Sequence, residues 1–409
     1  MNKSKSQLSK MTRIFLTIAT VIITGAWVVP ISTAQETGGE LGGGAGIFRP
    51  KNPEAKRTGA APRSPRLTPA EIEARFQDAL ADGNDARDAR KFVAAEGAYR
   101  TALRLKPRDA RAHYGLGNVF VDQQRWDDAE GSYRLALAAA PNNPETLTAL
   151  SFVLVQPRTG ALNARRFSDA EYFARRATQL APNSAIAFDR LGVAMTARGI
   201  FNNDAEAAFR HAMELDPNFV VAQVHLAGVL SRMGRRNDAE PIYKSAINQA
   251  KDAPTLVLIA DAMQTEQRWS DSGPVLRKAL DLDPRNPGAL FLMGRFLSVN
   301  KRYAEAASVL KTAAEVNPKS FTVRNVLARA YLGIPAYDDA FRTYEQAAPL
   351  ASDADRKQLA GQFGFGGVGD GYMSAGRPKD ALRAYQRALQ LDPGNAELQS
   401  KIAVARARS

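Results

Sequence analysis

Cysteine is absent from this chain of 409 residues, which excludes disulfide bonds, thiolate metal sites and cysteine nucleophiles. Histidine is scarce as well. Only His113, His211 and His225 occur, and no carboxylates pair with them at the spacing of metal ligands. No set of nucleophile, base and orienting residue is recognisable. The sequence therefore predicts a protein without catalytic residues, metal sites or cofactors, which is not an enzyme.

Acidic residues are absent before Glu36, and four basic residues precede an apolar run over residues 14–29. This run is shorter than the ~20 residues that a membrane-spanning helix needs. Small residues, Ser32 and Ala34, lie three and one positions before a cut after Ala34. We expect a cleaved signal peptide over 1–34, with the mature chain starting at Gln35. An uncleaved signal anchor is the alternative.

Large apolar groups are rare over residues 35–69, where Gly, Pro and Arg dominate. Such a segment cannot bury enough apolar surface to offset its ordering entropy, so we expect a disordered linker.

The formal net charge of +13 includes four basic residues in the signal, and six basic and three acidic residues in the linker. The remainder holds 45 basic and 39 acidic residues, a balance that does not favour nucleic-acid binding.

The stretch from Arg111 to Pro141 has the apolar periodicity of two helices with a turn near Gln123–Arg125. The pattern recurs down the chain, and the prolines that end successive units show its period. They are Pro107, Pro141, Pro182, Pro217, Pro284, Pro318 and Pro393, at intervals of 34, 41, 35, 67, 34 and 75 residues. The two longest intervals each hold two units, which makes nine units in all.

Most units also repeat their residue types. Second helices carry alanine, an aromatic residue four positions later and alanine three positions further, as in Ala129, Tyr133 and Ala136. First helices carry an apolar residue followed by a small one, as in Leu116-Gly117. Small residues let two helix backbones approach closely. Two short helices cannot bury a core alone, so the units are expected to stack on one another.

In length, order and residue types these units resemble the tetratricopeptide repeat family, from about residue 76 to 395. The resemblance implies an all-α, right-handed α-solenoid (superhelix) of about nine helix-turn-helix repeats, whose first helices line a concave groove. We expect the array over 70–395 and a C-terminal capping helix over 396–409. The expected units are near 76–109, 110–143, 144–184, 185–219, 220–252, 253–286, 287–320, 321–354 and 355–395.

The family resemblance places the fifth, sixth and ninth positions of each unit in the groove, where a protein or peptide would bind. Packing of these residues within the solenoid is the alternative. The family's Lys/Asn clamp for a terminal carboxylate is matched only by Asn118, so binding of chaperone tails is not indicated. The candidates are Tyr114, Asn118, Phe152, Arg190, Val224, His225, Val257, Leu258, Phe291, Leu292, Arg295, Asn325 and Arg329.

Two stretches depart from the repeat. Residues Gln156–Arg166 enlarge the turn of the third unit, which either extends the binding surface or is a tolerated insertion. The glycine-rich run Gly364–Gly369 matches G-x-G-x-x-G, the phosphate-binding motif. That motif needs a preceding strand, whereas helical repeats flank this run, so we interpret it as part of a weak helix.

The sequence thus predicts a non-enzymatic, exported scaffold, periplasmic or secreted, that binds protein or peptide partners in its groove. The alternative is a membrane-tethered accessory subunit of an envelope polysaccharide-export or secretion machine. No nucleic acid is expected as a partner. Membrane contact is expected only through an uncleaved N-terminal segment.

Overall fold

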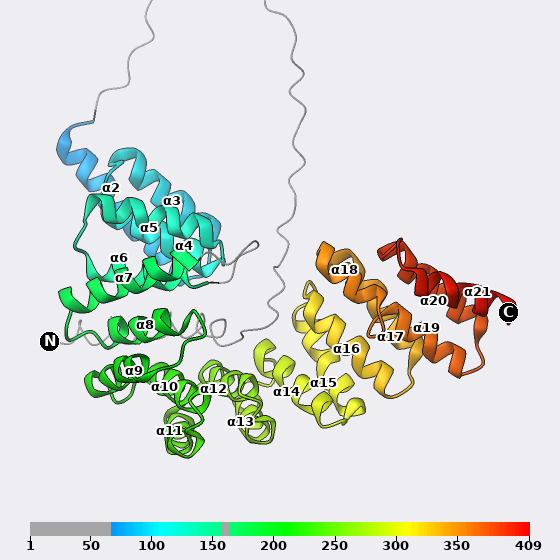
Figure 1. Ribbon diagram of the computed structural model, residues 1–409. Coiled ribbons are helices and arrows are strands. Elements are labelled where there is room, and N and C mark those ends of the chain that lie inside the picture. The colour runs from blue at the N-terminus through cyan, green and yellow to red at the C-terminus, as the bar shows by residue number, and fades with distance from the viewer. Residues whose placement is uncertain (1–66, 157–163) are drawn as a thin grey trace, which may run out of the picture. The chain divides into compact units, whose positions relative to one another are not determined.

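The computed structural model describes residues 67–156 and 164–409 (Figure 1). The predicted signal peptide, nearly all of the linker and most of the insertion after Gln156 lie outside the described residues. The chain divides into two compact units. Their described parts are residues 67–141, here called the N-terminal unit, and residues 142–156 and 164–409, called the C-terminal unit.

The N-terminal unit consists of two helix pairs. Helix α2 (Pro69–Asp88) packs on α3 (Phe92–Leu105), and α4 (Ala110–Asp122) packs on α5 (Trp126–Ala139). A capping box starts α2, since the Thr68 side chain accepts from the backbone N–H of Glu71 and the Glu71 carboxylate accepts from that of Thr68. The turn between α4 and α5 falls at the predicted place, and Gln124 adopts a positive φ of 58° there.

The C-terminal unit continues the same pairing of successive helices (Figure 1). All described elements of both units are helical, and the predicted all-α solenoid of paired helices is confirmed. The helices of this unit are α6 (Pro144–Leu154), α7 (Ala164–Leu180), α8 (Ala185–Thr196), α9 (Asn203–Leu215), α10 (Val220–Arg232), α11 (Arg236–Gln249), α12 (Ala253–Thr265), α13 (Trp269–Leu282), α14 (Pro287–Val299), α15 (Tyr303–Val316), α16 (Phe321–Gly333), α17 (Tyr337–Ala347), the short 3₁₀ helix η2 (Ala348–Leu350), α18 (Asp353–Ala360), α19 (Phe365–Ser374), α20 (Pro378–Leu391) and α21 (Ala396–Ala407).

Side-chain caps fix where most first helices begin. The residue before the helix is Asn, Ser or Asp, and its side-chain oxygen accepts a hydrogen bond from a backbone N–H of the first turn. Asn143, Ser184, Asp252, Asn286 and Ser320 act in this way for α6, α8, α12, α14 and α16. Each cap lies just after the end of the preceding second helix, so the local sequence sets the repeat boundary.

Contacts between a ring and a glycine hold the paired helices close together. A Cβ atom added at Gly117 of α4 would lie 2.6 Å from the Tyr133 ring of α5, and one at Gly192 of α8 would lie 2.6 Å from the Phe209 ring of α9. Both rings are almost wholly buried. A bulkier residue would force the backbones apart, as the apolar-small pattern predicts.

The glycine-rich run Gly364–Gly369 forms the start of α19, and α18, not a strand, precedes it. Its glycines are required by packing. A Cβ at Gly366 would lie 2.8 Å from the carbonyl oxygen of Ala360, and one at Gly369 would overlap the Tyr385 ring. The predicted helical interpretation of this motif is therefore confirmed.

Among residues 67–156 and 164–409, no helix combines the length and the apolar character needed to cross a membrane. The C-terminal residues form α21, whose Leu398 and Ala405 are buried against the last helix pair.

Two glycine substitutions in the N-terminal unit are expected to change stability in opposite directions. Gly117→Ala should destabilise it by about 1–3 kcal/mol, because the new methyl group would overlap the Tyr133 ring. Gly131→Ala on α5 should stabilise it by up to about 1 kcal/mol, because a Cβ there meets nothing within 4 Å and alanine favours the helix. Hydrogen exchange of the α4 and α5 amides measures both effects; equal effects of the two changes would contradict the packing described.

Candidate partner-binding site

Every residue predicted to face a partner lies on the first helix of a pair. In the structure, a partner can reach only some of these residues. Tyr114, Asn118, Phe291 and Arg295 are half-buried, and Arg329 is exposed. The other eight are buried among neighbouring helices, where they serve packing: Phe152, Arg190, Val224, His225, Val257, Leu258, Leu292 and Asn325.

The two candidates in the N-terminal unit are both next to Tyr133. The Tyr133 hydroxyl donates a hydrogen bond of 2.6 Å to Oδ1 of Asn118. The ring of Tyr114 lies 5.6 Å from the Tyr133 ring, centroid to centroid, in a tilted arrangement. Asn118 therefore holds a core tyrosine in place, which is a structural use of its polar side chain.

One cavity of the C-terminal unit has a volume of about 700 Å³, and it is lined by residues of α13 to α17, of α19 and of the segment before α19. Two of the predicted residues, Arg295 on α14 and Arg329 on α16, line it one repeat apart. Four aromatic side chains also line it: Trp269, Tyr303, Tyr337 and Phe363. We call this feature the arginine–aromatic cavity.

Arg295 lies between aromatic rings and is only loosely paired. Its guanidinium carbon is 5.5 Å from the Trp269 ring centroid and 5.8 Å from that of Phe291, within the range of cation–π attraction. Its closest acid is Asp261, at 3.8 Å between Nη1 and Oδ1. Burial holds the pKa of Arg295 below its usual value, and Asp261 acts against this. The guanidinium remains charged at neutral pH.

Arg329 extends the positive charge along the cavity. Its guanidinium carbon lies 4.8 Å from the centroid of the exposed Phe363 ring, and no described carboxylate forms an ion pair with it. Asp370 is the acidic residue on the cavity wall, and its carboxylate accepts from Lys401 Nζ at 2.9 Å and from the Tyr385 hydroxyl at 2.7 Å. The cavity wall therefore keeps an excess of positive charge.

Glycines make room for the aromatic wall. Trp269, Tyr303 and Tyr337 are the first residues of α13, α15 and α17. The Tyr303 ring occupies the space where a Cβ of Gly333 would lie, and the Tyr337 ring does the same at Gly371. These contacts fix the rings against the next first helix, so the cavity is largely pre-formed.

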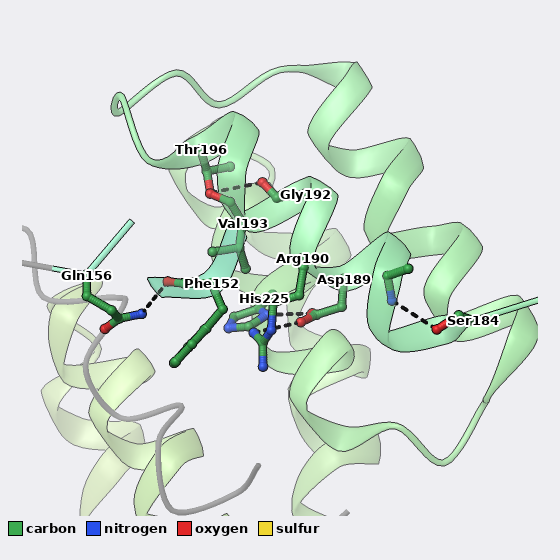
Figure 2. Close-up of polar contacts among 10 residues, drawn as sticks. Phe152, Gln156, Ser184, Asp189, Arg190, Gly192, Val193, Thr196 and His225 are labelled. Atoms are coloured by element: carbon green, nitrogen blue, oxygen red, sulfur yellow. Dashed lines mark hydrogen bonds and ion pairs between the residues drawn. The ribbon is translucent and has the colours of Figure 1, made fainter. Parts of the chain in front are cut away.

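A second polar feature lies inside the C-terminal unit (Figure 2). Asp189 and Arg190 of α8 and His225 of α10 form a cluster, with Arg190 Nη1 at 3.1 Å from Asp189 Oδ2 and His225 Nδ1 at 2.6 Å from Asp189 Oδ1. Their side chains are at most 3% exposed. Burial opposes ionisation of Asp189, but its two neighbours outweigh burial and hold its pKa below the usual value. The Phe152 ring lies 4.7 Å from the Arg190 guanidinium.

Several of these residues escape prediction from sequence. Trp269, Tyr303 and Tyr337 start successive second helices, and this recurrence is the signal in the sequence that could have identified them. Phe363 belongs to an irregular segment that no repeat position describes. The sequence does contain a signal for Asp189, because a carboxylate inside an apolar helical stretch needs a polar partner when it is buried. Within the described ranges, no group of three or more His, Asp or Glu side chains could hold a metal ion.

Family models match three parts of the chain. Models of the tetratricopeptide repeat match residues 80–144 and 265–330, and a TPR repeat model matches residues 369–409. These segments lie in both units, and the second one includes Trp269, Arg295 and Arg329 of the arginine–aromatic cavity.

The chain is 27% identical over 208 residues to cellulose synthase operon protein C from Xanthomonas axonopodis pv. citri. The match covers 50% of this chain but only 14% of that relative's length. Among solved structures, the chain is similar to a tetratricopeptide repeat protein from Parabacteroides merdae (17% identity, TM-score 0.47, 62% of this chain and 98% of that one). It is also similar to pilF from Pseudomonas aeruginosa (19% identity, TM-score 0.41, 53% and 96%).

Asp261→Asn is expected to stabilise the protein above about pH 6 and not near pH 4. Burial raises the pKa of Asp261 to about 6, although Arg295 acts in the opposite direction. The unfolded chain ionises this group near a pKa of ~3.9, so its ionisation costs stability as the pH rises through the folded value. The gain from the substitution should approach ~3 kcal/mol at most.

Urea unfolding of both forms across this pH range measures the difference. Asp281→Asn removes an exposed carboxylate from α13 and is the matched control, with little expected effect at either end of the range. A gain from Asp261→Asn that did not depend on pH would contradict the account of Asp261.

Proposed function

We propose that this chain, a tetratricopeptide repeat protein, is an exported scaffold without enzymatic activity that binds a partner in the arginine–aromatic cavity. Proteins with these repeats commonly bind peptides or other proteins. We infer that the part of the partner held in the cavity is an extended, acidic peptide segment that also carries an aromatic or other apolar side chain.

The observation that carries this proposal is the excess positive charge beside aromatic rings, of which Phe363 is exposed and Trp269 is half-buried. Arg329 has no described ion-pair partner, and Arg295 is 3.8 Å from its nearest acid. A carboxylate placed between them would gain charge-assisted hydrogen bonds that the free protein lacks. Trp269 and Phe363 hold the guanidinium groups by cation–π contact, which reduces the entropy lost when a ligand binds.

The size of the cavity supports a peptide. Its volume of about 700 Å³ lies in the range of small-ligand pockets, roughly 300–1,000 Å³, and is enough for a few side chains but not for a folded domain. Its wall is built by successive repeats, so an extended segment lying across them meets Arg295 and Arg329 in turn. This is recognition of a peptide in a helical groove.

Charge reversal in the cavity is expected to abolish peptide selection. When the full chain is immobilised and offered a phage-displayed library of random heptapeptides, we expect enrichment of acidic sequences that contain an aromatic residue. The double variant Arg295→Glu/Arg329→Glu should lose this enrichment. Binding of a selected peptide to the unaltered chain should weaken as salt is raised, because ionic contacts are screened.

The matched control is Arg277→Glu/Arg285→Glu, which makes the same change of net charge at two exposed arginines outside the cavity. It should keep the enrichment. Loss of enrichment in both double variants would mean that overall charge, and not the cavity, selects the peptides. Enrichment of neutral sequences by the unaltered chain would sink the proposal.

The relative from Xanthomonas favours a second candidate function. Its printed name associates it with a cellulose synthase operon, and this chain matches a part of it. We propose as the alternative that the chain is an accessory subunit of an envelope polysaccharide-export or secretion machine, tethered to the membrane by residues 1–34. Both candidates use the same cavity and differ in what the N-terminal residues do.

Fractionation of cells that produce the full chain distinguishes the two candidates. For the exported scaffold, we expect soluble protein in the periplasm or medium, with an N-terminus at Gln35 by sequencing. For the tethered subunit, we expect membrane-bound protein that retains Met1 and is released by detergent but not by high salt. Recovery of the protein from the cytoplasm, and from neither the periplasm, the medium nor the membrane, would contradict both candidates.

A further inference from the structure

Buried tyrosines of the second helices bond to a fixed position of the repeat. The hydroxyl groups of Tyr99, Tyr133 and Tyr385 donate hydrogen bonds of 2.6 to 2.7 Å to a side-chain oxygen of the residue 15 positions earlier. These acceptors lie on the first helix of the same pair and are Asn84, Asn118 and Asp370. An amide or carboxylate oxygen at this position thus fixes the tyrosine within its own helix pair.

The α16–α17 pair departs from this rule, since Arg329 occupies the position 15 residues before Tyr344. A guanidinium carries only hydrogen-bond donors, so it cannot accept from the hydroxyl. Burial raises the pKa of Tyr344 above its usual value, and Arg329 acts against this, as a cation close to the hydroxyl does. The hydroxyl instead donates to the backbone carbonyl of Phe363, at 2.6 Å.

Phe363 lies in the short turn between α18 and α19. Its ring is 54% exposed and lies 4.8 Å from the guanidinium carbon of Arg329, so a ligand in the cavity can touch it. The turn is tight, because a Cβ at Gly364 would overlap the carbonyl oxygen of Leu359. The hydrogen bond from Tyr344 therefore connects the buried core of one helix pair to an exposed ring on the cavity wall.

We propose that Tyr344 is a positioning residue of the arginine–aromatic cavity, which holds Phe363 against Arg329 and so sets the preference for an aromatic side chain in the bound peptide. Because the peptide is that of the proposed function, the role of Tyr344 in selection rests on that function, whereas its role in holding the turn does not. In the preceding pair, Arg295 occupies the same position, but Leu310 stands where the tyrosine would be and has no hydroxyl. The anchor thus belongs to the repeat that borders the turn.

Removal of the hydroxyl alone tests this role without opening the core. The Tyr344 ring packs on that of Phe365, at 5.6 Å between centroids, and Tyr344→Phe keeps this contact. The amides of Gly364 and Gly367 donate to the carbonyl of Gly361 within the turn. We expect these two amides of the full chain to exchange with solvent about three- to tenfold faster in Tyr344→Phe, the usual effect of one hydrogen bond.

The matched control is Tyr133→Phe, which removes a hydroxyl hydrogen bond of the same length from the N-terminal unit. It should leave the exchange of the two glycine amides unchanged. Unchanged exchange in Tyr344→Phe as well would overturn the proposal. If Tyr344→Phe destabilises the whole C-terminal unit, exchange will rise in α14 as much as in the turn, and two variants of Arg329 then decide.

These two variants leave the Tyr344 hydroxyl intact and change only what stands opposite it. Arg329→Asn supplies the acceptor that other repeats have, so the hydroxyl should return to its own helix pair and exchange in the turn should rise. Arg329→Lys supplies donors only and should keep the slow exchange. Equal exchange in the two variants would show that the missing acceptor is not what directs Tyr344 to the turn, and the proposal would be wrong.

Two blocked peptides, Asp-Asp-Phe-Asp-Asp and Asp-Asp-Ala-Asp-Asp, measure the effect on selection. Tyr344→Phe should bind the first about three- to tenfold more weakly than the unaltered chain does, and the second with unchanged affinity, because both cavity arginines remain. Equal weakening for both peptides would mean that Tyr344 supports the fold in general, against the proposal. If the unaltered chain binds neither peptide, the proposed function fails, and the exchange measurements still decide whether Tyr344 anchors Phe363.

Discussion

The close approach of paired helices, with a ring lying directly on a backbone that has no Cβ, is the contact on which the rest of this structure depends. Tyr99 lies on Gly83, Phe209 on Gly192 and Tyr385 on Gly369. Each contact sets the distance between the two helices of a pair. Because that distance recurs, each pair presents the same apolar surface to the next, and stacking of the pairs buries the core. The cavities arise where larger rings or charged groups interrupt this regular packing.

The repeat architecture is predictable from sequence because its determinants are local. The spacing of alanine, ring and glycine sets the helix pairs, and Asn, Ser or Asp caps set where helices begin. The irregular segment before α19 was harder to predict, since its path depends on the close approach of Gly364 and Gly366 to the backbone of Leu359 and Ala360, which no periodic pattern encodes. The positions of residues 1–66 and 157–163 lie outside what the structure describes.

The candidate site was predicted in part. Transferring the repeat register located Arg295 and Arg329, because exposed positions of a helix follow from its periodicity. The same transfer also selected Val224 and Leu258, which neighbouring helices bury. The repeat register predicts the direction in which a side chain points away from its own helix. It does not predict how closely the next helix covers that side chain. The rings of Trp269 and Phe363 complete the cavity through contacts between repeats, which a single unit cannot reveal.

The buried cluster of Asp189, Arg190 and His225 limits how this array can evolve. Many units are joined by apolar contacts and by ion pairs with solvent-accessible members, such as Arg125–Glu96 and Arg235–Glu206, whose loss water can compensate in part. The hydrogen bond from α10 to α8 is different, because it requires His225 on one unit and Asp189 on the other, and both side chains are buried. Loss or replacement of either unit would leave one buried group of this hydrogen bond, Asp189 Oδ1 or His225 Nδ1, without its partner, at a cost of about 1–3 kcal/mol. This pair of repeats must therefore be inherited together, as a single module of the chain.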